Sequence, residues 1–295
     1  MDIGLFSIGV GRTAAPDIIA QIARQADAVG FDSLWAPEHV VLFEDAAYTS
    51  QYPYNDTGRI GITDADLLDP FTALTFAAAH TERIKLATGI FLVPQRHPLV
   101  VAKMVASLDR LSKGRFVFGV GIGWLKEEFR ALGISPERRA QRTCEYLDAM
   151  RAVWTQANPS FEGEFCGFPA VKSLPKPVQQ PHPPVVFGGN SAPALRRAVH
   201  HGDGWFGFNL LPEEAAPSVQ QLQQHAREAG RSADDLFIAV APGEKMPQVT
   251  LDALKQYRDA GVKQVILRLP TANPDRIDAA LEEMAENLIV PAQSL

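Results

Sequence analysis

Two adjacent residues, Glu38 and His39, are the strongest candidates for chemistry in this sequence. They end the stretch Gly30-Phe-Asp-Ser-Leu-Trp-Ala-Pro-Glu-His39, whose middle is typical of a short buried strand. A histidine at the end of a strand can act as a general acid or base near neutral pH, and an adjacent carboxylate can help to set its charge. We therefore interpret both as candidate catalytic residues. The alternative is a surface histidine that only closes a loop.

Two glycine-containing strand ends could bring a ligand close to the backbone. Gly89 interrupts the strand pattern Leu86-Ala-Thr-Gly-Ile-Phe91. This indicates a bulge or a close approach by another backbone or a ligand, and the alternative is a packing glycine in the wall. The stretch Gly119-Val-Gly-Ile-Gly-Trp124 has GxGxG spacing. A dinucleotide-binding turn needs GxGxxG and a following strand that ends in an acid, so we reject that interpretation. A flat ring or a phosphate could still approach these amides, with Trp124 lining one wall.

A third glycine-rich stretch, Gly188-Gly-Asn-Ser191, precedes a helical pattern. Ser191 is typical of a helix N-cap, and Pro193 suits the first helical turn. Free amides at a helix N-terminus bind anions, so the stretch could hold the phosphate of a coenzyme. The alternative is a simple capped helix.

Several other functions are poorly supported. The sequence contains no GxSxG, Walker, HExxH or CxxC motif, and Cys144 and Cys166 follow no metal or redox spacing, so we predict no metal site. A net charge of −6 argues against nucleic-acid binding. The apolar stretches are too short for a membrane span, and the N-terminus has no signal-peptide pattern. We therefore expect a cytoplasmic protein that binds neither nucleic acid nor membrane.

Short strand patterns alternate with helical patterns along the whole chain, which favours a parallel sheet. Several strands are apolar on both faces, as expected when both sides are buried. The expected strands are 3–8, 31–36, 84–93, 116–120, 185–187, 204–208, 236–240 and 262–269. The expected helices are 17–29, 70–79, 99–111, 125–132, 136–154, 192–201, 213–229, 250–260 and 274–288. Eight such units predict a single α/β domain, 1–295, that folds as a (β/α)₈ TIM barrel.

Two segments do not fit the repeat. Residues 40–69 form a long insertion after the second strand, and residues 155–184, rich in Pro and Gly, follow the fourth unit. Long loops at the C-terminal ends of barrel strands typically cover the active site, so both insertions are candidates for that position. The alternative is that they are surface insertions without a role.

Taken together, these stretches resemble the bacterial-luciferase-like family of flavin and deazaflavin oxidoreductases. Tyr52-Pro-Tyr54, followed by Gly58-Arg59, further resembles a subgroup that uses the deazaflavin coenzyme F420. The matching stretches are 30–39, Asp69-Pro-Phe-Thr-Ala-Leu74, 81–89, 102–112, 113–124, 188–191 and Gly202-Asp-Gly-Trp205.

The resemblance implies a barrel with a non-proline cis peptide behind the coenzyme ring, and the matching bond is Gly89–Ile90. It places His39 beside the reactive face of the ring, and it implies a homodimer. Basic side chains that hold phosphate in some relatives are not evident beside Gly188, so backbone amides would dominate there, with Arg268 as a candidate helper. The predicted coenzyme-binding residues are Thr88, Gly89, Ile90, Gly121, Gly123, Trp124, Gly188, Gly189, Asn190 and Ser191.

The first functional hypothesis is hydride transfer between reduced F420 and a small organic substrate, with His39 moving a proton and Glu38 tuning it. The second is a monooxygenase that uses reduced FMN and oxygen. A third is a non-catalytic protein that only binds the coenzyme. A glycosidase with Glu38 and Glu244 as its two carboxylates ranks last, because strand four ends in glycine where an acid is expected.

Overall fold

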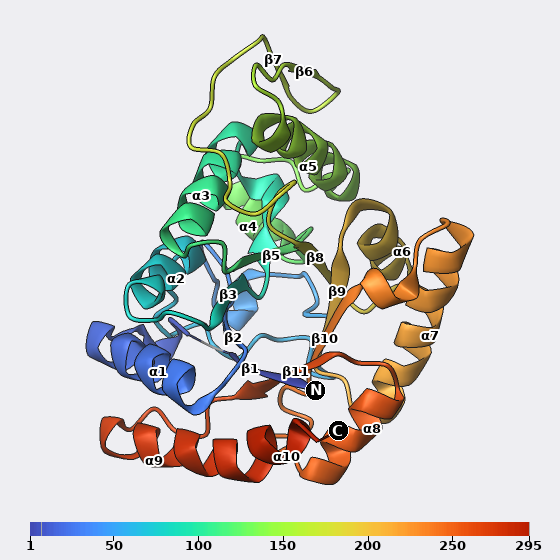
Figure 1. Cartoon of the computed structure of the whole chain (residues 1–295). Coiled ribbons are helices and arrows are strands. Elements are labelled where there is room, and N and C mark those ends of the chain that lie inside the picture. The colour runs from blue at the N-terminus through green and yellow to red at the C-terminus, as the bar shows by residue number, and fades with distance from the viewer. Residues whose placement is uncertain (7, 295) are drawn as a thin grey trace.

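The computed structural model of the chain describes residues 1–6 and 8–294 and has a closed parallel barrel at its centre (Figure 1). Each barrel strand pairs in parallel with its neighbours, and the β3–β5 and β1–β11 pairs complete the ring. The predicted (β/α)₈ barrel is therefore confirmed. The barrel strands are β1 (Asp2–Phe6), β2 (Ser33–Ala36), β3 (Lys85–Thr88), β5 (Phe116–Gly121), β8 (Val185–Gly188), β9 (Gly204–Phe208), β10 (Phe237–Ala241) and β11 (Gln264–Arg268).

The third strand is split, whereas the sequence pattern predicts one strand over 84–93. After β3 the chain turns at Gly89 and resumes as the short strand β4 (Phe91–Leu92), which also pairs with β5. The peptide bond between Gly89 and Ile90 is cis, as the resemblance implies. The split directs the side chain of Ile90 toward the end of the barrel, where it borders a cavity.

Helices surround the strands (Figure 1). Proline stands in the first turn of α1, α2, α3, α6, α7 and α9, where the missing N–H has no helical partner to lose. The helices are α1 (Pro16–Val29), α2 (Pro70–Ala78), α3 (Pro98–Leu111), α4 (Lys126–Ala131), α5 (Arg139–Thr155), α6 (Ala192–His201), α7 (Pro212–Glu228), α8 (Leu251–Asp259), α9 (Pro274–Met284) and α10 (Val290–Ala292); a π-helical turn (Ala285–Ile289) joins the last two. Short 3₁₀ turns cover Gly11–Ala14, Asp45–Ala47, Val93–Gln95 and Ala233–Asp235. None of the helices in the described residues is long and apolar enough to cross a bilayer.

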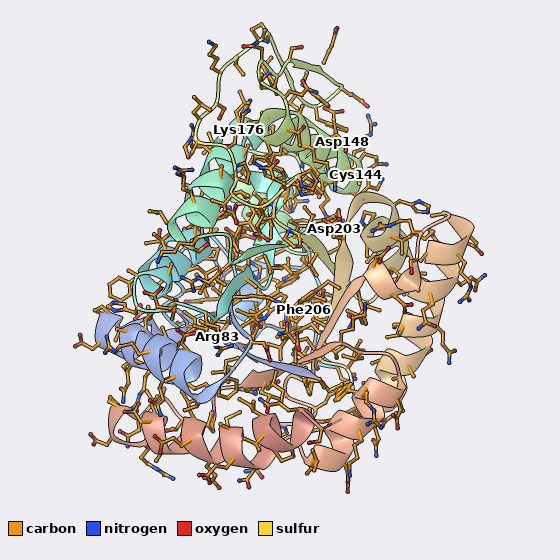
Figure 2. The ribbon with its side chains drawn as sticks, viewed as in Figure 1. Arg83, Cys144, Asp148, Lys176, Asp203 and Phe206 are labelled. Carbon is orange, nitrogen blue, oxygen red and sulfur yellow. The ribbon has the colours of Figure 1, made fainter. Side chains whose placement is uncertain are left out.

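The interior of the barrel is packed with side chains. Trp35 and Phe206 stack there with ring centroids 4.7 Å apart, and Phe206 lies at the centre of the molecule in Figure 2. A larger apolar core fills the space between the strands and the helices. Because the barrel is filled, a ligand has room only at its two ends. The inner cluster consists of Trp35, Ala87, Val117, Val186, Phe206, Ala239, Ala241 and Ile266.

The two insertions lie at different ends of the barrel. Residues 40–69 follow β2 and reach over the C-terminal ends of the strands, where Leu67 pairs with Val10. Residues 155–184 carry the β6–β7 hairpin (Phe161–Glu162 and Gly167–Phe168), which projects beyond α5 in Figure 1. This second insertion follows a helix and leads into the start of β8, so it approaches the barrel from the N-terminal ends of the strands. The expectation that it covers the active site is therefore wrong.

Candidate active site

A cavity of about 790 Å³ lies at the C-terminal ends of the barrel strands, between the strand ends and the first insertion. Its wall contains Glu38, His39 and all of the predicted coenzyme-binding residues except Thr88. The side chain of Thr88 is buried in the barrel wall, where its hydroxyl donates to the carbonyl oxygen of Gly119 at 2.6 Å. The carboxyl ends of the strands are where barrel enzymes place their active sites, so this cavity is the candidate.

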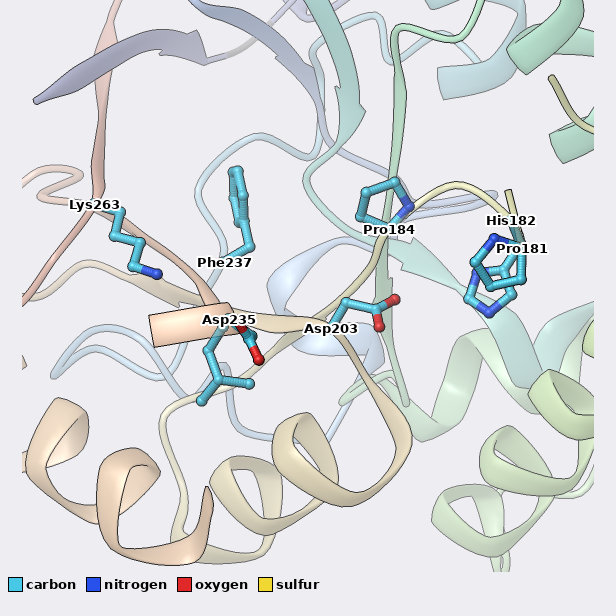
Figure 3. A pocket seen from close by; sticks show the side chains of 8 residues that line it. Pro181, His182, Pro184, Asp203, Asp235, Phe237 and Lys263 are labelled. Carbon is cyan, nitrogen blue, oxygen red and sulfur yellow. The ribbon is translucent and has the colours of Figure 1, made fainter. Parts of the chain in front are cut away.

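A smaller hollow of about 410 Å³ lies at the opposite end of the barrel (Figure 3). Its residues stand at or just before the starts of β8, β9, β10 and β11. The Asp203 carboxylate accepts from the Val185 amide at 2.8 Å, and the Lys263 ammonium donates to the Asp234 carbonyl oxygen. These charged groups already serve the fold, so among the described residues this hollow offers no set of groups free for chemistry.

Ile90 forms part of the cavity wall, and two glycines make room for it. A methyl group at Gly121 would lie 2.1 Å from Ile90 Cδ1, and one at Gly188 would lie 2.9 Å from Ile90 Cγ2. A methyl group at either position would therefore force the Ile90 side chain to move. Both glycines still line the cavity beside Ile90, so contact between their backbone and the ligand stays a prediction.

His39 lies in the cavity wall with both ring nitrogens engaged. Its Nδ1 is 3.1 Å from Glu128 Oε2, and its Nε2 accepts from the Trp124 indole N–H at 3.3 Å. The imidazole and indole rings meet edge to face, 5.8 Å apart. The side chain of His39 is 10% exposed, so it is held in place and still borders the cavity.

Glu128, in the first turn of α4, is the carboxylate that contacts His39. Its side chain is fully buried, and it also accepts from the Val40 amide at 2.7 Å and the Gln95 side-chain amide at 2.9 Å. Burial alone would raise the pKa of Glu128, but the hydrogen bonds from His39, Gln95 and Val40 outweigh it and hold that pKa below its ordinary value. The Glu128 carboxylate is therefore ionised at neutral pH.

Glu38 faces away from His39 and toward a different partner. Its Oε1 is 2.7 Å from Arg96 Nη2, and its Oε2 accepts from the Leu92 amide at 2.5 Å. Burial outweighs the attraction of Arg96 and raises the pKa of Glu38 to about 7. The two adjacent residues predicted to act together are thus divided between two networks, and Glu128 has the contact with His39 that the sequence hypothesis gave to Glu38.

Aromatic side chains of the first insertion cover the cavity. Tyr52 packs edge to face on Trp124 with centroids 5.3 Å apart, and Tyr54 packs on Phe208 at 5.4 Å. Burial raises the pKa of both phenols, that of Tyr54 to about 12, so their hydroxyls remain hydrogen-bond donors at neutral pH. We call residues 40–69 the roof loop. The apolar residues that the roof loop adds to the cavity wall are Tyr52, Pro53, Tyr54, Ile60, Ile62 and Leu67.

Glu127, the neighbour of Glu128, fastens the middle of the roof loop to α4. Its carboxylate accepts from the Thr49 amide at 3.0 Å and from the Ser50 hydroxyl at 2.7 Å. These hydrogen bonds outweigh the effect of burial and lower the pKa of Glu127 to about 2. Two consecutive carboxylates therefore hold the roof loop, one at its start and one at its middle.

Two arginines from neighbouring helices reach the cavity near Ser191. Arg139 of α5 donates from Nε to the Gly123 carbonyl oxygen at 2.9 Å. Arg197 of α6 has a buried Nε with no hydrogen-bond partner among the described residues, and burial lowers the pKa of its guanidinium. Ser191 is the N-cap residue of α6, as predicted, and its side chain makes no capping hydrogen bond. Guanidinium groups and a helix N-terminus are groups suited to binding an anion, so this part of the cavity lining is a candidate anion site.

The sequence showed no basic side chain beside Gly188, whereas the structure adds two arginines to the lining of the same cavity. Arg139 and Arg197 lie within helical patterns, and neither belongs to a motif at a strand end, so only the fold brings them to the cavity. Arg268, the suggested helper, lies on the rim, 4.0 Å from the exposed carboxylate of Glu244. Asn190 hydrogen-bonds the Phe208 backbone with both side-chain atoms, at 2.7 and 3.2 Å, so its side chain braces two strand ends.

The family model described as luciferase-like monooxygenase matches residues 1–287. An uncharacterized protein of Mycobacterium tuberculosis is 34% identical over 292 residues, which cover 98% of this chain and 99% of that protein. An FMNH₂-dependent dimethylsulfone monooxygenase of Pseudomonas putida is 37% identical over 157 residues, which cover 52% of this chain and 43% of that enzyme.

The fold is shared with a solved F420-dependent secondary alcohol dehydrogenase, determined with an F420–acetone adduct. The TM-score is 0.77 at 19% identity, and the superposition covers 98% of each chain.

Proposed function

Because the chain belongs to the luciferase-like monooxygenase family, we propose that it transfers hydride between coenzyme F420 and a small organic substrate bound beneath the roof loop. The observation that carries the proposal is a cavity that joins a buried, apolar-walled chamber to an anion site. The chamber holds His39 and Ile90, and the anion site is formed by Arg139, Arg197 and the N-terminus of α6. A coenzyme with a flat ring and an anionic tail would fit this cavity, because the ring suits the apolar wall and the tail suits the anion site.

The residues present fit such a coenzyme. Ile90 offers an apolar face for a flat ring, and the guanidinium group of Arg197, which lines the cavity, offers donors for phosphate. The cavity volume of about 790 Å³ lies within the range of small-molecule sites. The bound coenzyme would supply the hydride chemistry, and the protein would supply orientation, dryness and proton movement.

The chain's own residues then have separate tasks. His39, held at the cavity wall by Glu128, is the proposed catalytic residue that exchanges a proton with the substrate. Tyr52 and Tyr54 exclude water and offer hydroxyl donors to a polar group of the substrate. Glu38 is tied to Arg96 and Leu92, so we assign it to holding the strand ends in place.

F420 ranks above FMN because Tyr52-Pro-Tyr54 and Gly58-Arg59, which resemble the F420 subgroup, belong to the roof loop of the cavity. The second candidate is a monooxygenase that uses reduced FMN and oxygen. It is favoured by the 37% identity to the dimethylsulfone monooxygenase over half of this chain. Both candidates require the same anion site.

The test is a titration of the purified protein with F420 and, separately, with FMN, followed by the absorbance of each coenzyme. We expect F420 to bind at least about 10-fold more tightly, a difference of about 1.4 kcal/mol. Small secondary alcohols and ketones should then be screened for bleaching or recovery of F420 absorbance without oxygen. Tighter binding of FMN, with turnover that consumes oxygen, would reverse the ranking. A protein that binds F420 but is unchanged in every assay by His39→Ala would be a carrier.

Two further expectations from the resemblance stay predictions. A homodimer would sediment at twice the mass of the 295-residue chain in analytical ultracentrifugation. A cytoplasmic location would place the protein in the soluble fraction of its host cell.

A further inference from the structure

The partners of His39 leave its ring only one tautomer. An indole N–H is a donor and never an acceptor, so the His39 nitrogen that faces Trp124 must present a lone pair. The Glu128 carboxylate is an acceptor, so the nitrogen that faces it must carry the proton. The hydrogen bond at one ring nitrogen of a histidine fixes the state of the other.

We propose that Glu128 is a positioning residue that holds His39 in the tautomer with its proton on Nδ1, and so presents Nε2 to the cavity as a proton acceptor. In its consequence for turnover, this inference rests on the proposed function. The bond from Trp124 to Nε2 is long, at 3.3 Å, and a substrate can replace it. A substrate group that does so must itself bring a donor, such as a hydroxyl.

The carboxylate of Glu128 also binds the backbone at the start of the roof loop. Glu128 Oε1 accepts from the backbone amides of Val40 and Val41, at 2.7 and 3.3 Å, while Oε2 faces His39 and Gln95. One buried group therefore fixes both the ring of His39 and the backbone that follows it.

Glu128→Gln is a sharp test because the variant side chain keeps the shape of Glu128 and offers His39 a donor in place of an acceptor. Its carbonyl oxygen must face the amides of Val40 and Val41, which can only donate. Its NH₂ then faces His39 Nδ1 and the side chain of Gln95, whose Oε1 has no partner among the described residues. Gln95 can turn its amide to accept, and His39 must move its proton to Nε2. That proton ends the 3.3 Å bond from the Trp124 indole N–H, so the two rings must move apart in the variant. The variant therefore reverses the tautomer and keeps the shape of the side chain.

The measurement is ¹⁵N NMR of the full chain with labelled histidine, without coenzyme, since protonated and unprotonated imidazole nitrogens have well-separated shifts. The His39 signals are assigned as those missing in His39→Asn. We expect Nδ1–H in the wild type and Nε2–H in E128Q. The matched control is Glu127→Gln, which removes the adjacent carboxylate, also bound to the roof loop, and should keep Nδ1–H.

A wild-type protein with its proton on Nε2 would overturn the inference, and so would E128Q with Nδ1–H. The wild-type spectrum decides the point even if a variant does not fold. Because no coenzyme is present, the outcome is independent of whether F420 or FMN is bound. With the substrate found by the screen above, kcat of E128Q should fall about 100-fold, within the usual contribution of a general base, while coenzyme affinity changes little. An unchanged kcat in E128Q would refute the link to turnover.

Discussion

At the scale of single residues, Ile90 shapes the cavity more than any glycine does. Its side chain occupies the space beside Gly121 and Gly188, so it adds a branched apolar surface to the glycine backbone of the cavity wall. An apolar platform beneath a flat ring contributes by burial, at roughly 25 cal/mol for each Å² removed from water. The position of Ile90 should therefore control coenzyme affinity.

Gly121→Ala tests this role. The new methyl group would lie 2.1 Å from the end of the Ile90 side chain, which borders the cavity and can turn into it. We expect the coenzyme Kd to rise about 10-fold, with a small change in thermal midpoint. The double variant Gly121→Ala, Ile90→Ala removes the clash and should recover part of the affinity. Titration of both variants with F420 and FMN provides the check.

The same substitution two residues earlier supplies the contrast. A methyl group at Gly119 would lie 1.8 Å from the backbone oxygen of Thr88, which cannot turn aside. Gly119→Ala should therefore lower the free energy of unfolding by about 3 kcal/mol or more. If G121A destabilised the fold as much as G119A while leaving Kd unchanged, the platform role of Ile90 would be wrong.

At the scale of elements, helix α6 delivers an arginine to the cavity from outside the barrel. Arg197 stands two turns after Ser191, and its Nε has no partner among the described residues. Its exposed neighbour Arg196 has the same charge and does not line the cavity. The pair allows a test in which net charge is matched and only position differs.

Arg197→Gln should weaken binding of the coenzyme through its phosphate alone. We expect the affinity for FMN to fall about 10-fold or more, about 1.4 kcal/mol, while riboflavin, which lacks the phosphate, binds as before. Arg196→Gln should leave both affinities unchanged. Equal losses for FMN and riboflavin in R197Q would show that Arg197 supports the ring or the fold and does not bind the phosphate.

Elements differ in how far the sequence predicts them. Strands such as β8 and β11 are apolar on both faces and bounded by helical patterns, so their existence follows from periodicity. The break after Thr88 leaves no mark in hydrophobicity. Gly89 within the strand pattern indicated an irregularity, and the family resemblance identified it as a cis peptide bond. An insertion lies at the C-terminal ends of the strands if it follows a strand, and at their N-terminal ends if it follows a helix. Residues 155–184 follow the two helices of the fourth unit, so they belong to the second case.

In the candidate site, too, some residues could be predicted from the sequence and others could not. His39 and the glycine stretches were found because they lie at strand ends, where one strand positions them. Glu128 and Arg96 lie 89 and 57 residues after His39. Contacts between residues so far apart in the chain form only when the barrel closes. Composition and motif spacing therefore do not predict them. The one local signal for Glu128 was a pair of acids opening a helix directly after a glycine-rich strand end.

At the scale of the whole molecule, Glu38 couples global stability to pH. Its pKa is raised to about 7 in the folded chain, because burial outweighs the attraction of Arg96, while the ordinary value is 4.5. Between these two values the folded state holds a proton that the unfolded state has lost. Stability from Glu38 is therefore fully present below pH 4.5 and is lost as pH rises toward 7 and beyond.

Glu38→Gln should remove this dependence. At about 1.36 kcal/mol per unit of pKa, the wild type should lose about 3 kcal/mol between pH 4.5 and 8 from this group, whereas the side-chain amide of E38Q has no proton to lose. The amide oxygen can accept from Leu92 or from Arg96 but not from both, and this loss does not vary with pH. Arg96 keeps Asp69 at 3.6 Å, so we expect E38Q to fold. Urea unfolding of both proteins at pH 5, 6, 7 and 8 gives the comparison.

Glu128 does not interfere, because its lowered pKa makes its contribution fade only in more acidic solution. The difference in unfolding free energy between E38Q and the wild type should widen steadily with pH in favour of the variant; parallel curves would mean that the Arg96 pair keeps Glu38 ionised throughout.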